Sequence, residues 1–324
     1  MNFIKKSIFI ILVSFFFSFS AKAEVNVVTT IKPLHSLVSS VMKGVGEPSL
    51  IIEGTNNPHT FVFKPSHAEM IENADIVFWI GEDLEAFMEK PLDSLAKNAK
   101  TIAFMDLASI EKLKFRELNI FDDHDDHGHK DDEHDDEHDG HDDHDDHAGH
   151  HDGHNHGEFD AHIWLDPANA KEMVLEISHE LSELDPSNKS KYEDNASKTI
   201  AALDTLIEEV DNSLSKDISY IVFHDAYQYF ETRFGVKSAG ALTLNPDVLP
   251  GAKQIADIQD LINDKGIKCI FSEPQYNPKI IETLGNDMNI STGVMDPLGA
   301  YIEAGPSMYS ELINEIANSI KNCH

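Results

Sequence analysis

Histidine and aspartate alternate along residues 121–158, which read FDDHDDHGHKDDEHDDEHDGHDDHDDHAGHHDGHNHGE. Residues 122–157 contain twelve of the nineteen histidines, fourteen aspartates, two glutamates and one lysine. Imidazole nitrogens bind borderline cations such as zinc, copper and nickel, and carboxylates add oxygen ligands and attract cations. An acidic spacer that only maintains solubility has no need of so many histidines. The composition therefore indicates metal handling.

The same segment has almost no apolar residue, so it cannot bury a core, and we expect a disordered, solvated loop over 121–158. Its many ligands without a fixed arrangement predict several weak metal sites. The candidate ligands are His124, His127, His129, His134, His138, His141, His144, His147, His150, His151, His154 and His156.

The N-terminus has the pattern of a secretory signal peptide. Lys5 and Lys6 precede an apolar run over 8–19, and Ala-Lys-Ala at 21–23 forms a cleavage site with small residues. The apolar run is shorter than the roughly 20 residues that a membrane span needs, which argues against a retained anchor. We therefore expect residues 1–23 to be removed and the mature chain to be periplasmic.

The formal net charge is −33, and the sixteen acids and single lysine of 122–157 account for −15 of it. Such a charge argues against nucleic acid or an anionic membrane as partner and favours the attraction of cations. The sequence contains two cysteines, Cys269 and Cys323. In an exported protein this pair most simply predicts one disulfide, and a two-thiol metal site is the alternative.

Outside the loop, short apolar runs alternate with amphipathic stretches, which predicts an α/β fold with parallel sheets. About 300 mature residues favour two domains. A helical pattern over 185–217 predicts a long rigid helix between an N-terminal lobe, 24–184, and a C-terminal lobe, 218–324. The predicted strands are 25–30, 49–53, 75–80, 101–105, 218–224, 237–242, 267–272 and 290–295. The predicted helices include 34–42, 66–74 with a capping box at Ser66, 84–88, 166–184, 252–263, 278–288 and 307–321.

Three histidines and one aspartate lie where predicted strands or helices end. His59 follows the run 49–53, His162 precedes the helix at 166, His224 ends the strand 218–224, and Asp296 follows the strand 290–295. In open α/β sheets ligands bind at the carboxyl ends of strands, so a site between the lobes could gather all four. Spacing alone does not bring them together, because they are far apart in sequence.

Several segments together resemble a known family. In chain order they are IKPL at 31–34, PHTF at 58–61, KPS at 64–66, ADIVFWIG at 74–81, DAHIWLDP at 160–167, FHDAY at 223–227, FSEPQ at 271–275 and DPLG at 296–299. This set resembles the cluster A-I metal-binding proteins of ABC importers, and specifically the ZnuA-type periplasmic zinc-binding proteins. The His/Asp-rich loop is similar to that of the zinc branch.

The resemblance implies two Rossmann-like lobes with parallel sheets, joined by a long rigid backbone helix, with a metal site in the cleft between them. It implies that His59, His162 and His224 bind the metal and that Glu273 supports them. Three imidazoles favour zinc over manganese. Asp296, a water or a carboxylate from the loop could complete the coordination. The family's disulfide also matches the two cysteines.

The function that we predict is capture of Zn²⁺ in the periplasm and delivery to an ABC importer, a membrane permease with its cytoplasmic ATPase. We expect a monomer that is not an enzyme, with a loop that collects zinc weakly. Two alternatives stay open. One is a zinc buffer or adhesin that acts through the loop. The other is a zinc hydrolase with Glu273 near the metal, although the sequence has no HExxH motif.

Overall fold

The computed structural model describes residues 25–121, 157–246 and 248–323. The predicted signal peptide, the twelve histidines of the loop and His324 lie outside these described residues. The first described part forms a parallel sheet with strand order β2-β1-β3-β4. Its elements are β1 (Val27–Thr29), α1 (Lys32–Met42), β2 (Ser49–Leu50), α2 (Pro65–Glu72), β3 (Ile76–Trp79), α3 (Glu82–Glu85), η1 (Ala86–Met88), α4 (Glu89–Leu95), β4 (Lys100–Ala103) and η2 (Phe104–Asp106).

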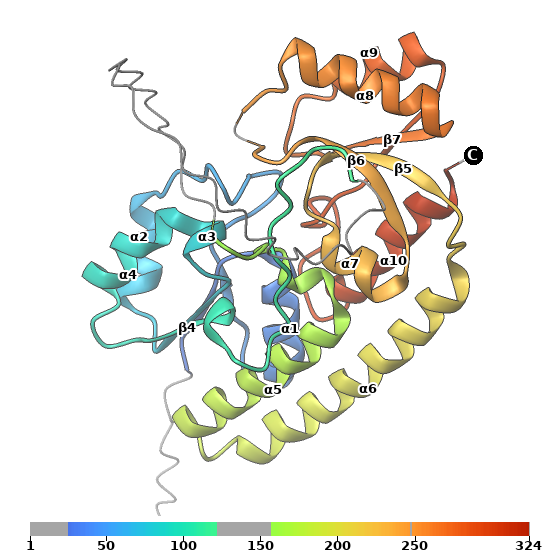
Figure 1. Cartoon of the computed structure of the whole chain (residues 1–324). Coiled ribbons are helices and arrows are strands. Elements are labelled where there is room, and N and C mark those ends of the chain that lie inside the picture. The colour runs from blue at the N-terminus through green and yellow to red at the C-terminus, as the bar shows by residue number, and fades with distance from the viewer. Residues whose placement is uncertain (1–24, 122–156, 247, 324) are drawn as a thin grey trace, which may run out of the picture.

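A second parallel sheet has the strand order β6-β5-β7-β8. Figure 1 shows α8 and α9, in orange, covering its outer face, away from the first sheet. Its elements are β5 (Ser219–His224), α7 (Gln228–Phe234), β6 (Lys237–Thr243), α8 (Ala252–Lys265), β7 (Cys269–Ser272), α9 (Lys279–Met288), β8 (Ser291–Val294) and α10 (Met308–Lys321). The α/β class and the two parallel sheets are therefore confirmed, and each predicted strand segment overlaps a strand, although β2 covers only two residues of the predicted 49–53.

Strand β5 is apolar on both faces because both faces are covered. Ile221 and Phe223 pack in the cluster that α8 and α9 complete, whereas Tyr220 and Val222 join the larger core on the opposite face. Successive side chains of a strand alternate between faces, so His224 shares the inner face with Val222. This alternation directs His224 toward the first half of the molecule, by which we mean the part built around the first sheet, β2-β1-β3-β4.

Two helices connect the sheets. After η3 (Ile163–Leu165), α5 (Pro167–Leu184) begins as predicted, and Asp166 Oδ1 accepts a hydrogen bond from the backbone N–H of Ala168 at 2.8 Å. The long helix α6 (Lys189–Ser213) has 25 residues, about 38 Å at 1.5 Å per residue. In Figure 1 it runs along one side of the molecule and leads directly into β5.

The start of α6 differs from the expected position near Asp185. The Asp185 carboxylate accepts hydrogen bonds from Ser187 Oγ and Asn188 Nδ2, both at 2.6 Å, so a turn precedes the helix. The capping box at Ser66 was also wrong. Helix α2 begins at Pro65, and Nδ1 of His67 accepts a hydrogen bond from the backbone N–H of Lys64 at 3.1 Å.

One hydrophobic core runs through both halves. Helix α10 packs against α1 and α6, and its Met308, Leu312 and Ile316 belong to the same cluster as residues of α1, β3 and α5. A disulfide joins Cys269 in β7 to Cys323 after α10, which confirms the predicted pair. This core contains residues from both predicted lobes, 24–184 and 218–324. The limits of these lobes therefore stay a prediction.

Residues 113–121, which we call the strap, pair at their start with residues 158–160 and at their end with the edge of the second sheet beside β6 (Figure 1). The backbone N–H of Phe121 donates to Ala239 O at 3.0 Å, and the backbone N–H of Ala241 donates to Asn119 O at 2.9 Å. The strap therefore carries the chain from the first half to the second just before residue 122. None of the helices in the described parts is both long and apolar enough to cross a membrane.

Candidate metal centre

His224 is positioned by the two central strands of the second sheet. It ends β5, and Glu273 directly follows the neighbouring strand β7, so both lie at the carboxyl edge of the sheet. Nδ1 of His224 lies 2.7 Å from Oε1 of Glu273, and both residues are 3 % exposed. An ionised carboxylate can only accept, so Nδ1 carries the hydrogen and Nε2 presents a lone pair.

His162 has a carboxylate partner of its own. Oδ1 of Asp160 lies 2.7 Å from Nδ1 of His162 and also accepts a hydrogen bond from the backbone N–H of His162 at 2.9 Å. The following turn η3 brings Trp164 beside the imidazole, with ring centroids 5.2 Å apart. Asp160 was not recognised as a functional residue from the sequence, although an acid two residues before a candidate ligand is a usable signal.

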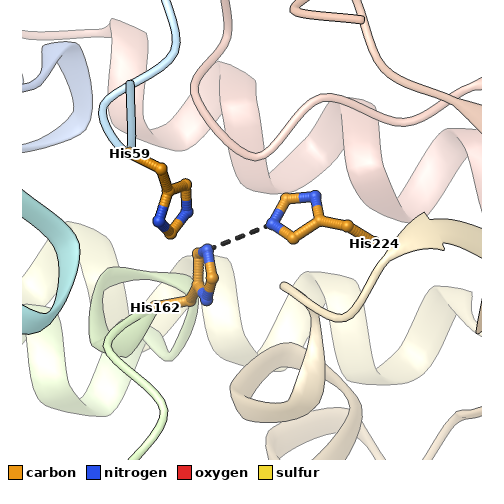
Figure 2. Close-up of side chains that lie close together, drawn as sticks. All are labelled: His59, His162 and His224. Atoms are coloured by element: carbon orange, nitrogen blue, oxygen red, sulfur yellow. Dashed lines mark hydrogen bonds between the residues drawn. The ribbon is translucent and has the colours of Figure 1, made fainter. Parts of the chain in front are cut away.

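His59 lies on the segment between β2 and α2. Its backbone N–H donates to Oδ1 of Asn57 at 2.9 Å, which fixes the turn after Pro58. The His59 ring centroid lies 5.7 Å from that of His162 and 6.0 Å from that of His224. Figure 2 shows the three rings, from three separate segments, converging on one point.

Each of these three histidines offers a nitrogen within 4.8 Å of the others. Nε2 of His162 and Nε2 of His224 are 3.3 Å apart. Two nitrogens that bind one zinc ion at about 2.0–2.1 Å in tetrahedral geometry are about 3.3–3.4 Å apart. Because both Nδ1–H groups are directed to carboxylates, two lone pairs face each other at the spacing that a shared zinc ion requires.

Asp296 does not join this group. Its Oδ1 accepts hydrogen bonds from Gln275 Nε2 and the backbone N–H of Leu298, both at 2.9 Å. Its Oδ2 accepts from the backbone N–H of Ala300 at 2.5 Å. The carboxylate suggested as a fourth ligand is thus engaged with its own loop.

The cavity at the three histidines is small. Its volume is about 10 Å³, which is the space of one water molecule or one ion. Trp164, Tyr276, Pro297 and Leu298 supply apolar walls around the imidazoles. The space between the imidazoles therefore fits a single ion.

The surroundings of His224 are negative. Burial lowers the pKa of His224. The negative charges of Glu273, Asp225 and Asp160 raise this pKa by more than burial lowers it, so the net shift is upward. Burial also raises the pKa of Asp225 to about 7, although Arg116 Nη1 lies 2.8 Å from its Oδ1. Buried carboxylates behind the imidazoles favour a cation in front of them.

A second group of possible ligands lies on α5 and consists of His179, Glu180 and Glu183. Lys100 already forms ion pairs with both glutamates of this group. His179 is exposed, as expected from its place on an amphipathic helix. We interpret the group as a surface ion-pair network.

Comparison with known proteins gives a consistent result. A family model described as "Zinc-uptake complex component A periplasmic" (ZnuA) matches residues 27–323. The high-affinity zinc uptake system protein ZnuA of Brucella abortus (strain 2308) is 49 % identical over 304 residues, which cover 92 % of this chain and 91 % of that protein.

Solved structures share the fold at lower identity. A crystal structure of ZnuA has a TM-score of 0.73 and 20 % identity, and the match covers 93 % of this chain and 99 % of that chain. The periplasmic zinc-binding protein TroA from Treponema pallidum has a TM-score of 0.72 and 18 % identity, with 93 % and 99 % covered. From these matches and the geometry above, we conclude that the chain belongs to the ZnuA family of periplasmic zinc-uptake components.

Proposed function

We propose that this protein captures Zn²⁺ with His59, His162 and His224 and delivers it to an ABC importer. The observation that carries the proposal is the pair of Nε2 atoms, 3.3 Å apart, on two imidazoles that are each oriented by a buried carboxylate. Carboxylate partners of this kind fix the tautomer of a zinc-binding histidine and increase its basicity. The three imidazoles are neutral ligands that suit zinc better than manganese or magnesium.

Three protein ligands leave one position of a tetrahedral zinc ion for a water molecule or for a carboxylate from residues 122–157. We do not assign Asp296 as the fourth zinc ligand, because both of its carboxylate oxygens already accept hydrogen bonds from backbone N–H groups of its own loop. Glu273 supports the site through Nδ1 of His224 rather than as a ligand.

Delivery follows from the family to which the chain belongs. Proteins of the family are periplasmic components of a zinc-uptake complex, and the B. abortus relative carries the name of a high-affinity uptake protein. We infer that residues 1–23 direct export and are removed near Ala23. We also infer that the monomeric, zinc-loaded protein docks on a membrane permease whose cytoplasmic ATPase drives transport.

The family also bears out the prediction that the chain is not an enzyme. The other alternative, a buffer or adhesin that acts through the His-rich loop, differs in where the tightest site lies. We propose that the loop collects zinc weakly and that the three histidines hold it tightly.

A calorimetric titration separates these two functions. The mature protein without residues 122–157 is titrated with zinc beside the same protein carrying His224→Ala. His179→Ala is the matched control, because it removes an exposed histidine outside the three-histidine site. We expect one tight site that survives the deletion and the control and is lost or greatly weakened by His224→Ala. If the protein without residues 122–157 has no tight zinc site, the tight site lies in the loop and the proposal is wrong.

A further inference from the structure

Lys32 is a buried lysine that does not line the cavity at the three histidines. It is the first residue of α1 and is 8 % exposed. Its ammonium group donates hydrogen bonds to the backbone carbonyl oxygens of Gly299, Ala300 and Ile302 at 2.9, 2.8 and 3.1 Å. An ammonium has three N–H bonds, so all of its donors are directed to one short loop. Such charge-assisted bonds are stronger than bonds between neutral groups.

The same loop, residues 296–302, is also stabilised from within by its first residue, Asp296. Its carboxylate accepts the backbone N–H groups of Leu298 and Ala300. Lys32 therefore binds carbonyl groups of the loop while Asp296 binds its amides. Gly299 has a φ of +60° at the turn, a backbone conformation that side chains other than hydrogen rarely adopt, so the turn favours glycine.

Loop 296–302 is also a wall of the histidine cavity. Pro297 and Leu298 line that cavity together with the three imidazoles. The carbonyl oxygen of Pro297 accepts a hydrogen bond from Nε1 of Trp164 at 2.8 Å, and the Trp164 ring lies against His162. Movement of the loop would open the cavity to water at the side of His162.

We propose that Lys32 is a positioning residue of the metal centre, which keeps loop 296–302 closed over the bound ion and so slows its release. The proposal rests on the proposed function, in which the three histidines hold Zn²⁺. Lys32 lies near the start of the described chain and the loop near its end, so their contact joins two segments far apart in sequence at a loop that also lines the histidine cavity. A loop held in this way excludes water that would otherwise assist exchange of the ligands.

The test uses the mature protein with its His-rich segment intact. Zinc release is followed by stopped flow after addition of a strong chelator, and Co²⁺ absorption reports whether three imidazoles still bind the metal. For Lys32→Met we expect release at least about tenfold faster, since several charge-assisted hydrogen bonds are lost, with the Co²⁺ spectrum retained. Lys32→Arg keeps the charge and donors and should restore most of the slow release.

Ser36→Ala is the matched control. Ser36 Oγ, also on α1, donates to Gly305 O at 2.7 Å and accepts from the backbone N–H of Tyr309 at 3.0 Å, but it does not contact loop 296–302 through these bonds. We expect this control to lower stability without changing the release rate. Asp296→Asn is a second probe, because its amide nitrogen cannot accept the N–H of Ala300, and it should also accelerate release.

Each outcome decides between the two proposals. Unchanged release in Lys32→Met, or equal changes in Ser36→Ala, would overturn the role of Lys32 and leave only a structural contact. A wild-type protein without a tight zinc site would instead contradict the proposed function. If Lys32→Met does not fold, Lys32→Gln, which keeps two N–H donors but not the charge, takes its place and is measured against Ser36→Ala in the same way.

Discussion

Oε1 of Glu273 lies 2.7 Å from Nδ1 of His224, and each of the two residues is 3 % exposed. The carboxylate thus determines which nitrogen of the imidazole faces the cavity. Two strands bring the pair together, since His224 ends β5 and Glu273 follows its neighbour β7. The sheet itself therefore orients this candidate ligand.

Replacing Glu273 by Gln should weaken zinc binding. The amide can still accept a hydrogen bond from Nδ1–H, but the loss of charge makes the imidazole less basic. We expect about 10–100-fold lower affinity, measured by competition with a chelator of known affinity. Glu282→Gln on α9 is the control, because that carboxylate is exposed and outside the site. Equal affinities for both variants would exclude a supporting role for Glu273.

Stability of the metal-free protein should fall as pH rises from about 4.5 to 7 because of Glu85. Burial raises the pKa of Glu85 to about 7, although hydrogen bonds from Thr30, Ile80 and Gly81 oppose this shift. In that pH range the folded state binds a proton that the unfolded state has released, so protonation favours folding at lower pH. The shift corresponds to roughly 3 kcal/mol that is lost by pH 8.

Glu85→Gln should remove the part of this pH dependence that Glu85 contributes, whereas Asp225, whose pKa is also raised to about 7, should still lower stability over the same range. The measurement is the free energy of unfolding by urea at pH 5, 7 and 8, with Glu82→Gln as the control because Glu82 is exposed in the same helix. Wild type and Glu85→Gln should be similar in stability at pH 5, where Glu85 is neutral, and Glu85→Gln should be the more stable at pH 8. Parallel pH profiles would show that Glu85 is ionised throughout.

Removing the disulfide should destabilise the protein without abolishing zinc binding. Cys269 and Cys323 are 54 residues apart, and closure of such a loop contributes roughly 4 kcal/mol in the chain-entropy estimate. We therefore expect the double variant Cys269→Ser with Cys323→Ser to unfold at lower urea concentration. Oxidised wild type treated with a reductant should match the variant, and a zinc affinity that falls with stability would link the disulfide to the site.

Substitution of Gly240 should displace the strap. A Cβ at Gly240 would lie 2.6 Å from Asn119 O, so the edge of β6 accepts the strap only as glycine. We expect Gly240→Ala to cost about 1–3 kcal/mol in the free energy of unfolding. Gly251→Ala is the control, because nothing lies within 4 Å of its added Cβ. Faster hydrogen exchange at Phe121 and Ala241 would locate the damage, and unchanged exchange there would contradict the assignment.

The sheets were predictable because their signals are local. The apolar run of β5 and the start of α5 at Asp166 need only neighbouring residues to be recognised, and both agree with the structure. The start of α6 was missed because Asp185 can cap either a helix or a turn. The sequence does not say which backbone amides or side chains will reach it.

The histidines of the candidate site were predictable from their positions at element ends and from the resemblance. Asp160 and Lys32 were not recognised as supporting residues. The bonds of Lys32 go to backbone carbonyls 267 to 270 residues away, which leave no mark in the side-chain pattern. Asp296 has a suitable type and position for a ligand, but hydrogen bonds visible only in the folded chain direct it elsewhere.

Helix α10, the last helix of the described residues, packs against α1, the first of them. A chain that is still being synthesised or exported lacks that partner, and Leu37 and Val41 belong to the core that α10 completes. Contacts between residues so distant in sequence also close slowly. The face of α1 that α10 covers must therefore stay exposed to water until the segment of α10 has also emerged and can pack on it.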